Sequence, residues 1–251
     1  MFQCDLRWED ALKNRTQIDA YLAEVTGADI ILLPELFSTG FSVASTYLAE
    51  TMDGETVVWM KSMSKKKKAV LCGSVMIEDK ERIFNRLLWV EPNGRVLYYD
   101  KRHLFTMIEE DKYFTSGTKR LILEYEGWKI CPMICYDLRF PVFARNDVDY
   151  DLLLFVANWP DKRIVAWDAL LKARAIENQT YVIGLNRVGI DGFNAEYPGH
   201  SQVFDPEGDS ISKAPEYEVG LVEVTLSKNH LMECRKRHPF LSDRDTFTIT
   251  D

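Results

Sequence analysis

Apolar residues recur at helical intervals in three stretches of the chain, residues 8–25, 55–68 and 163–179. Residues three or four positions apart lie on one side of a helix, so each stretch predicts an amphipathic helix with one buried face. The apolar positions of the first and third stretches are Leu12, Ile18, Tyr21, Leu22 and Val25, and Trp167, Leu170, Leu171, Ala175 and Ile176. In the third stretch Arg174 and Glu177 are also spaced to pair with each other.

Short runs of β-branched and aromatic residues lie between the predicted helices. Such runs, bounded by polar residues and turn formers, are typical of strands. We predict strands at 30–33, 69–77, 82–90, 95–99, 121–125, 130–134, 151–157, 181–186, 201–205 and 220–225. The segments Pro92-Asn93-Gly94 and Pro206-Glu207-Gly208 are typical hairpin turns. Helices alternate with strands, but hairpins link several strands, so we predict an α/β chain with mixed sheets, such as a two-sheet sandwich flanked by helices.

The bulk composition favours one large domain without a nucleic-acid surface. The chain has 251 residues, 46% of them hydrophobic, and no linker-like segment, so we predict a single domain over residues 1–251. The net charge of -8 and the pI near 5.2 argue against nucleic acid as a partner, because phosphate binding needs clustered Lys and Arg. We interpret the one basic run, Lys65 to Lys68, as the solvated end of the second helix.

The numbers and spacing of the cysteines and histidines indicate the cellular compartment and whether a metal is expected. Five cysteines, an odd number without a CxxC pair, favour a reducing compartment, so we expect a cytoplasmic protein. No run approaches the roughly 18 apolar residues of a membrane helix, and the first residues are not typical of a signal peptide. The four histidines show no metal-ligand spacing, with no HxxxH motif and no Cys/His cluster, so we expect no metal.

Three predicted strands are followed by side chains that can do chemistry. Glu35, Lys101 and Cys135 each come directly or almost directly after an apolar run. Open α/β sheets bind their ligands beyond the carboxyl ends of their strands. The strand ends therefore present a carboxylate, an ammonium and a thiol where a ligand is expected.

These three groups supply what an acyl transfer through cysteine requires. A cysteine attacks as the thiolate, so it needs a base or a nearby positive charge, and the developing oxyanion needs donors. Glu35 could take the thiol proton, pass it to departing ammonia, and later activate water. Lys101 and the backbone N–H of Tyr136 could hold the oxyanion.

Other interpretations of the same residues stay open at this point. Taken alone, Cys135 could be a small buried hydrophobic residue. Glu35 could cap the element that follows Pro34, and Lys101 could be a solvated charge at the end of a strand. Within catalysis, a Cys/His dyad with His103 or His200 as the base is a rival arrangement. Spacing along the sequence does not separate these possibilities.

Six segments of the chain resemble, in order, those of the nitrilase, or carbon-nitrogen hydrolase, superfamily. The three that resemble its signature segments are Pro34-Glu35-Leu36-Phe37, Asp100-Lys101-Arg102-His103-Leu104-Phe105 and Cys135-Tyr136-Asp137-Leu138-Arg139-Phe140-Pro141. The three that resemble its framework are Ala157-Asn158-Trp159-Pro160, Ala173-Arg174-Ala175-Ile176-Glu177-Asn178-Gln179, and Gly199-His200-Ser201 ahead of Asp205-Pro206-Glu207-Gly208. The resemblance covers nearly the whole chain, and six segments in the right order make it specific.

This resemblance implies a four-layer αββα sandwich, usually paired into homodimers, and a hydrolase without cofactor or metal. Carried over to this chain, Glu35 is the general base, Lys101 the oxyanion stabiliser and Cys135 the nucleophile. The family commonly has a further glutamate after the lysine segment, for which Glu110 is the better match and Glu109 the fallback. The chain begins at what resembles the middle of the family's first strand, so we expect a departure from the family at one sheet edge.

Within the superfamily, the lysine segment, CYDLRFP and VANWP are similar to the bacterial omega-amidase branch. Members of that branch deaminate the ω-amides of 2-oxoglutaramate and 2-oxosuccinamate. The resemblance therefore implies an omega-amidase that hydrolyses small dicarboxylate monoamides through a cysteine thioester. Another amidase or carbamoylase of the superfamily is the alternative, a nitrile hydrolase fits the segments less well, and a non-catalytic scaffold would require none of the three chemical groups.

Such a substrate carries a carboxylate remote from its amide, so its pocket needs a cation. Arg139 is the candidate nearest in sequence to the nucleophile, unless it pairs internally with an acid such as Asp137. The candidate apolar walls and further substrate-binding residues are Phe41, Phe114, Trp159, Tyr136 and Asn158, although aromatic residues are also typical of the core. The expected partners are thus a small-molecule amide and a second copy of the chain, with neither nucleic acid nor membrane.

Overall fold

Within residues 1–250, which the computed structural model describes, the chain forms five α-helices and fourteen β-strands. The helices are α1 (Ala11–Leu22), α2 (Glu55–Lys67), α3 (Glu110–Tyr113), α4 (Ile164–Asn178) and α5 (Lys228–Arg237). The strands are β1 (Phe2–Gln3), β2 (Ile30–Leu32), β3 (Val70–Asp79), β4 (Arg82–Val90), β5 (Val96–Asp100), β6 (Leu123–Tyr125), β7 (Trp128–Ile134), β8 (Leu152–Ala157), β9 (Tyr181–Asn186), β10 (Val188–Ile190), β11 (Glu196–Pro198), β12 (Gln202–Phe204), β13 (Ser210–Lys213) and β14 (Gly220–Leu221).

Two sheets form the centre of the molecule. One has six strands in the order β13-β12-β9-β8-β7-β6, and the other has four in the order β2-β3-β4-β5. Strands β7, β8 and β9 run parallel, as do β2 and β3, whereas the remaining pairs in these sheets are antiparallel. The two predicted hairpin turns join β4 to β5 and β12 to β13. The sheets are therefore mixed, as the sequence predicts.

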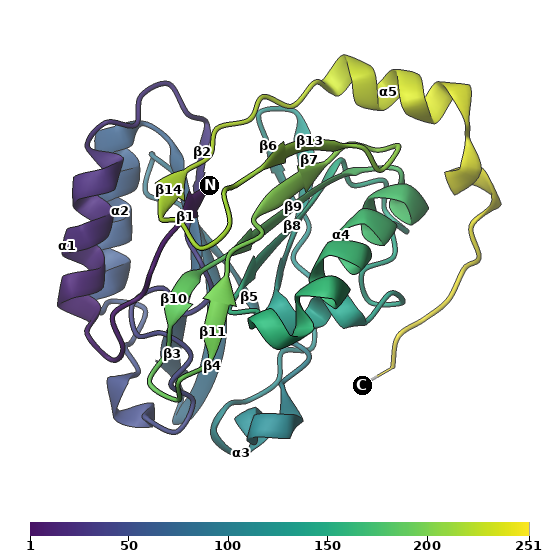
Figure 1. The fold of residues 1–251 in the computed structure, drawn as a ribbon. Coiled ribbons are helices and arrows are strands. Elements are labelled where there is room, and N and C mark those ends of the chain that lie inside the picture. The colour runs from purple at the N-terminus through teal and green to yellow at the C-terminus, as the bar shows by residue number, and fades with distance from the viewer. Residues whose placement is uncertain (251) are drawn as a thin grey trace.

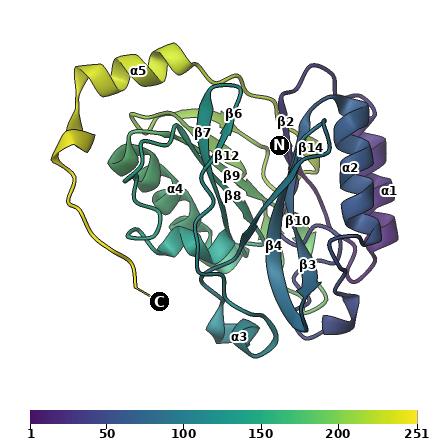
Figure 2. The same ribbon diagram turned by 180° about the vertical axis from the view of Figure 1, so that it is seen from behind.

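Helices cover the outer faces of the two sheets. Figures 1 and 2 show α1 and α2 beside the four-stranded sheet and α4 beside the six-stranded sheet. In β3, Leu71 and Val75 pack with residues of α1 and α2, whereas Val70 and Cys72 pack into the cluster shared by the two sheets. Alternate side chains of a strand point to opposite faces, so each sheet has two buried faces. This four-layer αββα arrangement is the predicted fold.

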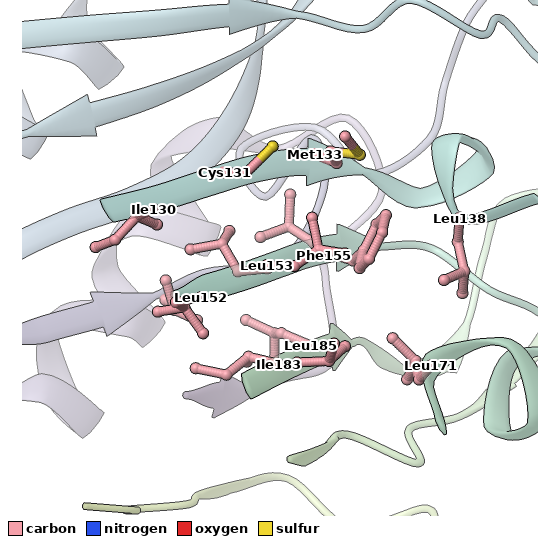
Figure 3. Packing of buried hydrophobic residues seen from close by; sticks show 14 of the residues in the cluster. Ile130, Cys131, Met133, Leu138, Leu152, Leu153, Phe155, Leu171, Ile183 and Leu185 are labelled. Atoms are coloured by element: carbon pink, nitrogen blue, oxygen red, sulfur yellow. The ribbon is translucent and has the colours of Figure 1, made fainter. Parts of the chain in front are cut away.

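The parallel strands of the six-stranded sheet are buried on both faces, which explains their continuous apolar runs. Figure 3 shows Cys131 of β7, Leu153 of β8 and Ile183 of β9 on neighbouring strands, with Leu171 of α4 beside them. A side chain at Gly184 of β9 would place its Cβ 2.3 Å from Leu171 Cδ1. Only glycine permits α4 to pack this closely, and the packed core holds the strand ends in place.

The first predicted helix is shorter than expected, and its predicted face is partly wrong. Helix α1 begins after Asp10, whose side chain accepts the backbone N–H of Lys13 at 2.9 Å as an N-cap. Leu12, expected on the apolar face, is 68% exposed. The buried face carries Asn14 together with Ile18, because the Asn14 side chain hydrogen-bonds to loop backbone.

The other two predicted helices agree with α2 and α4 to within one residue at each end. The predicted pair on α4 is present, with Arg174 Nη1 2.9 Å from Glu177 Oε1. Ile176 is 47% exposed, so the predicted apolar face is too wide there. At the end of α2, Lys65, Lys66 and Lys68 are exposed, in agreement with a solvated helix end.

The sequence patterns missed the shortest and the most polar elements. Strands β10, β11 and β13 and helices α3 and α5 were not predicted, and the predicted strand at 220–225 is reduced to β14, which pairs with β1, the strand that the family resemblance implied at the start of the chain. Helix α5 buries only Leu231 and Cys234, so it lacks the apolar stripe that marks a helix in sequence. No helix within residues 1–250 is both long and apolar enough to cross a membrane.

Candidate active site

Four segments that follow strands meet at one place in the sandwich. Glu35 follows β2, Lys101 follows β5, Cys135 follows β7 and Asn158 follows β8. All four are buried; Glu35 is fully enclosed and Cys135 is 8% exposed. The structure therefore brings together the carboxylate, the ammonium and the thiol that the sequence places at strand ends.

Lys101 lies between two carboxylates. Its Nζ is 2.9 Å from Glu35 Oε1 and 3.0 Å from both Oε1 and Oε2 of Glu110. Glu110 begins α3, is fully buried, and also accepts a backbone N–H at 2.6 Å. Its neighbour Glu109 instead pairs with exposed Lys112. Of the two candidate glutamates, Glu110, the better match in the sequence, is the one in the cluster.

Two asparagines hold the Glu35 carboxylate. Asn85 Nδ2 donates to Glu35 Oε1 at 2.8 Å and lies 3.4 Å from Glu110 Oε1. Asn158 donates its backbone N–H to Glu35 Oε2 at 2.9 Å. A carboxylate held by several donors keeps one orientation toward the reacting atoms. Asn85 was missed in the sequence, where the available signal was a polar residue inside the apolar strand β4, because a buried amide needs partners.

Cys135 sits at a sharp bend between β7 and the short helix Cys135–Arg139. Its φ is +42°, in the left-handed region that a residue with a side chain adopts only under strain. Asp137 holds this bend, because it accepts a backbone N–H of β7 at 3.0 Å and the Tyr99 hydroxyl at 2.8 Å. The Sγ atom lies 3.8 Å from the backbone oxygen of Asn158. The bend thus fixes where the thiol points.

Burial and the charge of Glu35 keep this thiol protonated. Burial raises the pKa of Cys135 well above its ordinary value, and the Glu35 charge adds to this effect while Lys101 opposes it. Burial lowers the pKa of Lys101, but the carboxylates of Glu110 and Glu35 outweigh burial and hold that pKa above its ordinary value. Burial also raises the pKa of Glu110. A neutral thiol beside a charged pair needs a base at the moment of attack.

The alternative Cys/His dyad finds no support in the geometry. Neither His103 nor His200 is among the hydrogen-bond or charge partners of Cys135, and neither lines the cavity at this thiol. The charged neighbours of Cys135 are Glu35 and Lys101. The arrangement favours a carboxylate over an imidazole as the base.

A cavity of about 710 Å³ opens at Cys135. The predicted binding residues that line it are Phe41, Tyr136, Arg139, Asn158 and Trp159. Phe114 is not among the lining residues, contrary to expectation, because it is buried in an apolar cluster that also contains Met76 of β3. Lys162 and Arg163 also line the cavity and were not anticipated.

Arg139 supplies a cation to this cavity. Its guanidinium carbon lies 4.8 Å from the centre of the Trp159 ring. The internal pair with Asp137 does not form, because Asp137 is engaged by Tyr99 and His103. Within residues 1–250, Arg139 has no carboxylate partner, so a guanidinium stacked on an aromatic face is available to an anionic group of a ligand.

Comparison with known proteins decides the family. The family model described as carbon-nitrogen hydrolase matches residues 1–236. The chain belongs to the carbon-nitrogen hydrolase family. The superfamily resemblance is thereby confirmed, and the cluster around Cys135 is the candidate active site of a carbon-nitrogen hydrolase.

The relatives of this carbon-nitrogen hydrolase cover almost all of its length. Omega-amidase YafV of Escherichia coli K12 is 43% identical over 249 residues, which span 99% of this chain and 97% of that protein. The 2-oxoglutaramate amidase of Bacillus subtilis is 31% identical over 247 residues, 96% of this chain and 95% of that protein. A CN-hydrolase superfamily protein of Xanthomonas campestris, solved with an arsenic adduct in its active site, has a TM-score of 0.97 and 43% identity over 100% of this chain and 97% of its own. The predicted fold class is confirmed.

Proposed function

We propose that this protein is an omega-amidase, which hydrolyses the ω-amide of small dicarboxylate monoamides such as 2-oxoglutaramate and 2-oxosuccinamate to the acid and ammonia. The observation that carries the proposal is the buried Glu35–Lys101–Glu110 cluster beside Cys135, in a cavity that also contains the guanidinium of Arg139. The similarity to omega-amidase YafV and to 2-oxoglutaramate amidase supports the substrate class.

Acylation begins when Glu35 takes the Sγ proton of Cys135. The thiolate forms a bond to the amide carbon, and the carbonyl oxygen becomes an oxyanion that Lys101 Nζ and the backbone N–H of Tyr136 stabilise. When the tetrahedral intermediate collapses, the carbon–nitrogen bond breaks and the Glu35 proton passes to the nitrogen. Ammonia leaves, and the acyl group remains on Cys135 as a thioester.

Deacylation uses the same groups with water. Glu35, again ionised, takes a proton from water, and the resulting hydroxide forms a bond to the thioester carbon. Collapse of the second tetrahedral intermediate breaks the carbon–sulfur bond, and the proton on Glu35 returns to Cys135. The acid product leaves and the resting thiol is restored.

Glu110 is proposed to position Lys101 rather than to transfer protons. It contacts Nζ through both carboxylate oxygens at 3.0 Å, which fixes the direction of the ammonium group. The two carboxylates also keep Lys101 protonated in spite of its burial. A preoriented cation in a water-poor site stabilises an oxyanion more strongly than the same cation in water.

At the other end of the substrate, Arg139 is proposed to bind the remote carboxylate. Its planar guanidinium can contact both carboxylate oxygens. Phe41, Trp159 and the ring of Tyr136 would pack against the short carbon chain. A neutral amide without this carboxylate would lose the contact with Arg139 and bind more weakly.

The test is ammonia release from 2-oxoglutaramate and from succinamate by the wild type and by Cys135→Ala. We expect wild-type turnover and a loss in the variant of at least roughly 10⁴-fold, because no thioester can form. Turnover of N-carbamoyl amino acids in place of these amides would indicate a carbamoylase. An inactive wild type whose Cys135 reacts with iodoacetamide no faster than Cys234 would indicate a non-catalytic scaffold.

We also propose that the chain forms a homodimer in the cytoplasm. The superfamily resemblance supports the dimer, and five cysteines without a disulfide between them support a reducing compartment. Sedimentation equilibrium should give twice the chain mass of 29.1 kDa. A monomeric mass would contradict the proposed assembly.

A further inference from the structure

A second group of reactive side chains lies outside the active site, between α5 and the turn that joins β12 to β13. One ligand atom each from Glu207, His230 and Cys234 lies within 4.8 Å of the other two. Glu207 is exposed in the turn, His230 is half-buried, and Cys234 is 2% exposed. A thiol, an imidazole and a carboxylate therefore converge from two separate segments of chain.

The helix explains how two of these groups meet. His230 and Cys234 are four residues apart on α5, so their side chains lie on the same side of the helix. Cys234 Sγ is 3.5 Å from His230 Nε2 and 3.9 Å from Nδ1. In a tetrahedral site, Zn–S and Zn–N bonds of about 2.3 and 2.0 Å separate sulfur from nitrogen by roughly 3.5 Å. The Sγ–Nδ1 distance of 3.9 Å is somewhat longer than this value, so a small movement of the two side chains would bring them to the spacing of such a site.

Asp205 orients the imidazole. Its Oδ1 accepts the backbone N–H groups of Glu207 and Asp209, both at 2.9 Å, which locks the carboxylate within the turn. Its Oδ2 lies 3.3 Å from His230 Nε2. When Nε2–H donates to this carboxylate, the lone pair on Nδ1 is free to bind a metal. A histidine held by a carboxylate through its second nitrogen is the usual arrangement of a metal-bound imidazole.

We propose that Glu207, His230 and Cys234 form a Zn²⁺ site, with Asp205 as the positioning residue of the imidazole. Cys, His and carboxylate ligands together are typical of Zn²⁺, whereas a thiolate does not suit Ca²⁺ or Mg²⁺. The fourth position is taken by water. The sequence has no HxxxH motif, and Glu207 lies far along the chain from His230 and Cys234, so this group does not stand out as a metal site in the sequence.

The contact that Glu207 makes at present is weak enough for a metal to replace it. Glu207 Oε1 lies 3.1 Å from Arg237 Nη1, but both side chains are largely exposed, and exposed pairs contribute about 0 to 1 kcal/mol. A metal binds cysteine as the thiolate, so metal binding releases the Cys234 proton. The ion therefore replaces the weak contact between Glu207 and Arg237 and the proton of the Cys234 thiol.

A metal here would fasten α5 to the sheet. In Figure 1, α5 runs along the outside of the molecule, past β13 and α4. Only Leu231 and Cys234 of this helix are buried, so its apolar anchoring is small. A ligand that binds only the folded state stabilises it by mass action. We therefore assign the site a structural role, independent of the proposed amidase reaction.

The test is Co²⁺ titration of the full-length Cys135→Ala protein, which removes the active-site thiol as a competing ligand. We expect one Co²⁺ per chain, with a thiolate-to-metal charge-transfer band that Zn²⁺ abolishes by displacement. Adding Cys234→Ser should remove the band. Adding His230→Ala should weaken binding by at least roughly 100-fold, because even outer partners of metal sites contribute 10- to 100-fold.

Two further variants separate loss of a ligand from loss of structure. Because Cys234 is buried, its replacement could disturb α5, so exposed Glu207→Gln is the second ligand variant, expected to weaken binding at least tenfold with an unchanged circular dichroism spectrum. His238→Ala removes an exposed imidazole just beyond α5 and should leave the affinity unchanged. The proposal is overturned if no charge-transfer band develops, or if the band survives Cys234→Ser. Neither outcome depends on whether the protein is an omega-amidase.

Discussion

Cys135 and Cys234 are both buried thiols, but their surroundings differ in kind. Cys135 lies at a strained bend beside Glu35 and fully buried Lys101, and it lines a cavity. Cys234 lies on a helix near the surface, beside His230 and the exposed carboxylate of Glu207. Burial raises the pKa of both thiols, so burial alone does not assign either a role.

The neighbours decide what each thiol can do. At Cys135 the neighbours are the carboxylate of Glu35, which follows β2, and the ammonium group of Lys101, which follows β5. This pair suits proton transfer and oxyanion binding. At Cys234 the neighbours are metal ligands within one helix and one turn. The other three cysteines, Cys4, Cys72 and Cys131, lie in the apolar core, where burial raises their pKa.

The largest expected effect in this comparison comes from Glu35→Gln. Loss of the base should lower kcat by roughly 10²- to 10⁴-fold. The same change removes a negative charge that raises the pKa of Cys135, so the rise of the iodoacetamide alkylation rate with pH should move to lower pH. In the wild type, the alkylation rate should rise steadily with pH in the alkaline range. A changed circular dichroism spectrum together with lower kcat and an unshifted alkylation profile would mean that Glu35 maintains the structure of the site rather than accepting the thiol proton.

A smaller effect is expected from Glu110→Gln, with Glu109→Gln as the matched control. Loss of one charged hydrogen-bond partner of Lys101 should reduce kcat by roughly 10- to 100-fold, because such bonds contribute about 1.5–3 kcal/mol. Glu109 pairs with Lys112 at the surface, so its variant should retain wild-type kcat. Equal losses in both variants would argue against a specific role for Glu110.

Arg139→Gln should affect substrate binding more than the chemical step. For 2-oxoglutaramate we expect KM to rise about tenfold, because the guanidinium–carboxylate contact is lost. For a neutral amide such as butyramide, kcat/KM should be unchanged. If both substrates lose the same factor, Arg139 acts through its packing on Trp159 and another cation binds the carboxylate.

The smallest effect concerns the α5 region alone. The Ser227 side chain accepts the N–H of His230 at 3.2 Å as the N-cap of α5. Ser227→Ala should lower the free energy of unfolding by about 1 kcal/mol, and Tm by about 2–4 °C, without changing kcat. Thermal unfolding followed by circular dichroism checks this, with Ser242→Ala as an exposed control. A parallel fall in kcat would show that α5 is coupled to the active site.

Much of the fold was predictable from local patterns. Helices α2 and α4 and strands such as β4 and β9 follow from apolar periodicity, because most of the residues that they bury are apolar. The pattern failed where burial depends on hydrogen bonds. Asn14 of α1 is buried through bonds to loop backbone, while Leu12 is exposed.

The candidate site was predictable in part for a similar reason. Glu35, Lys101 and Cys135 follow apolar strands directly, so their place at strand ends could be expected from sequence. Asn85 could not, because its role depends on the distance of its amide from the carboxylates of two other segments. Phe114 was assigned to the cavity wall by residue type alone, and packing in the core decided otherwise.

The sequence by itself determined the order of buried strands and the chemical groups that follow them, because hydrophobic periodicity and strand termination are local properties of the chain. It also determined the family, through segments whose residues are contiguous. Only the tertiary structure decided between Glu110 and Glu109, placed Arg139 on Trp159, and brought Glu207 to His230 and Cys234. These contacts depend on the packing of side chains from distant segments of the chain, which local sequence patterns do not predict.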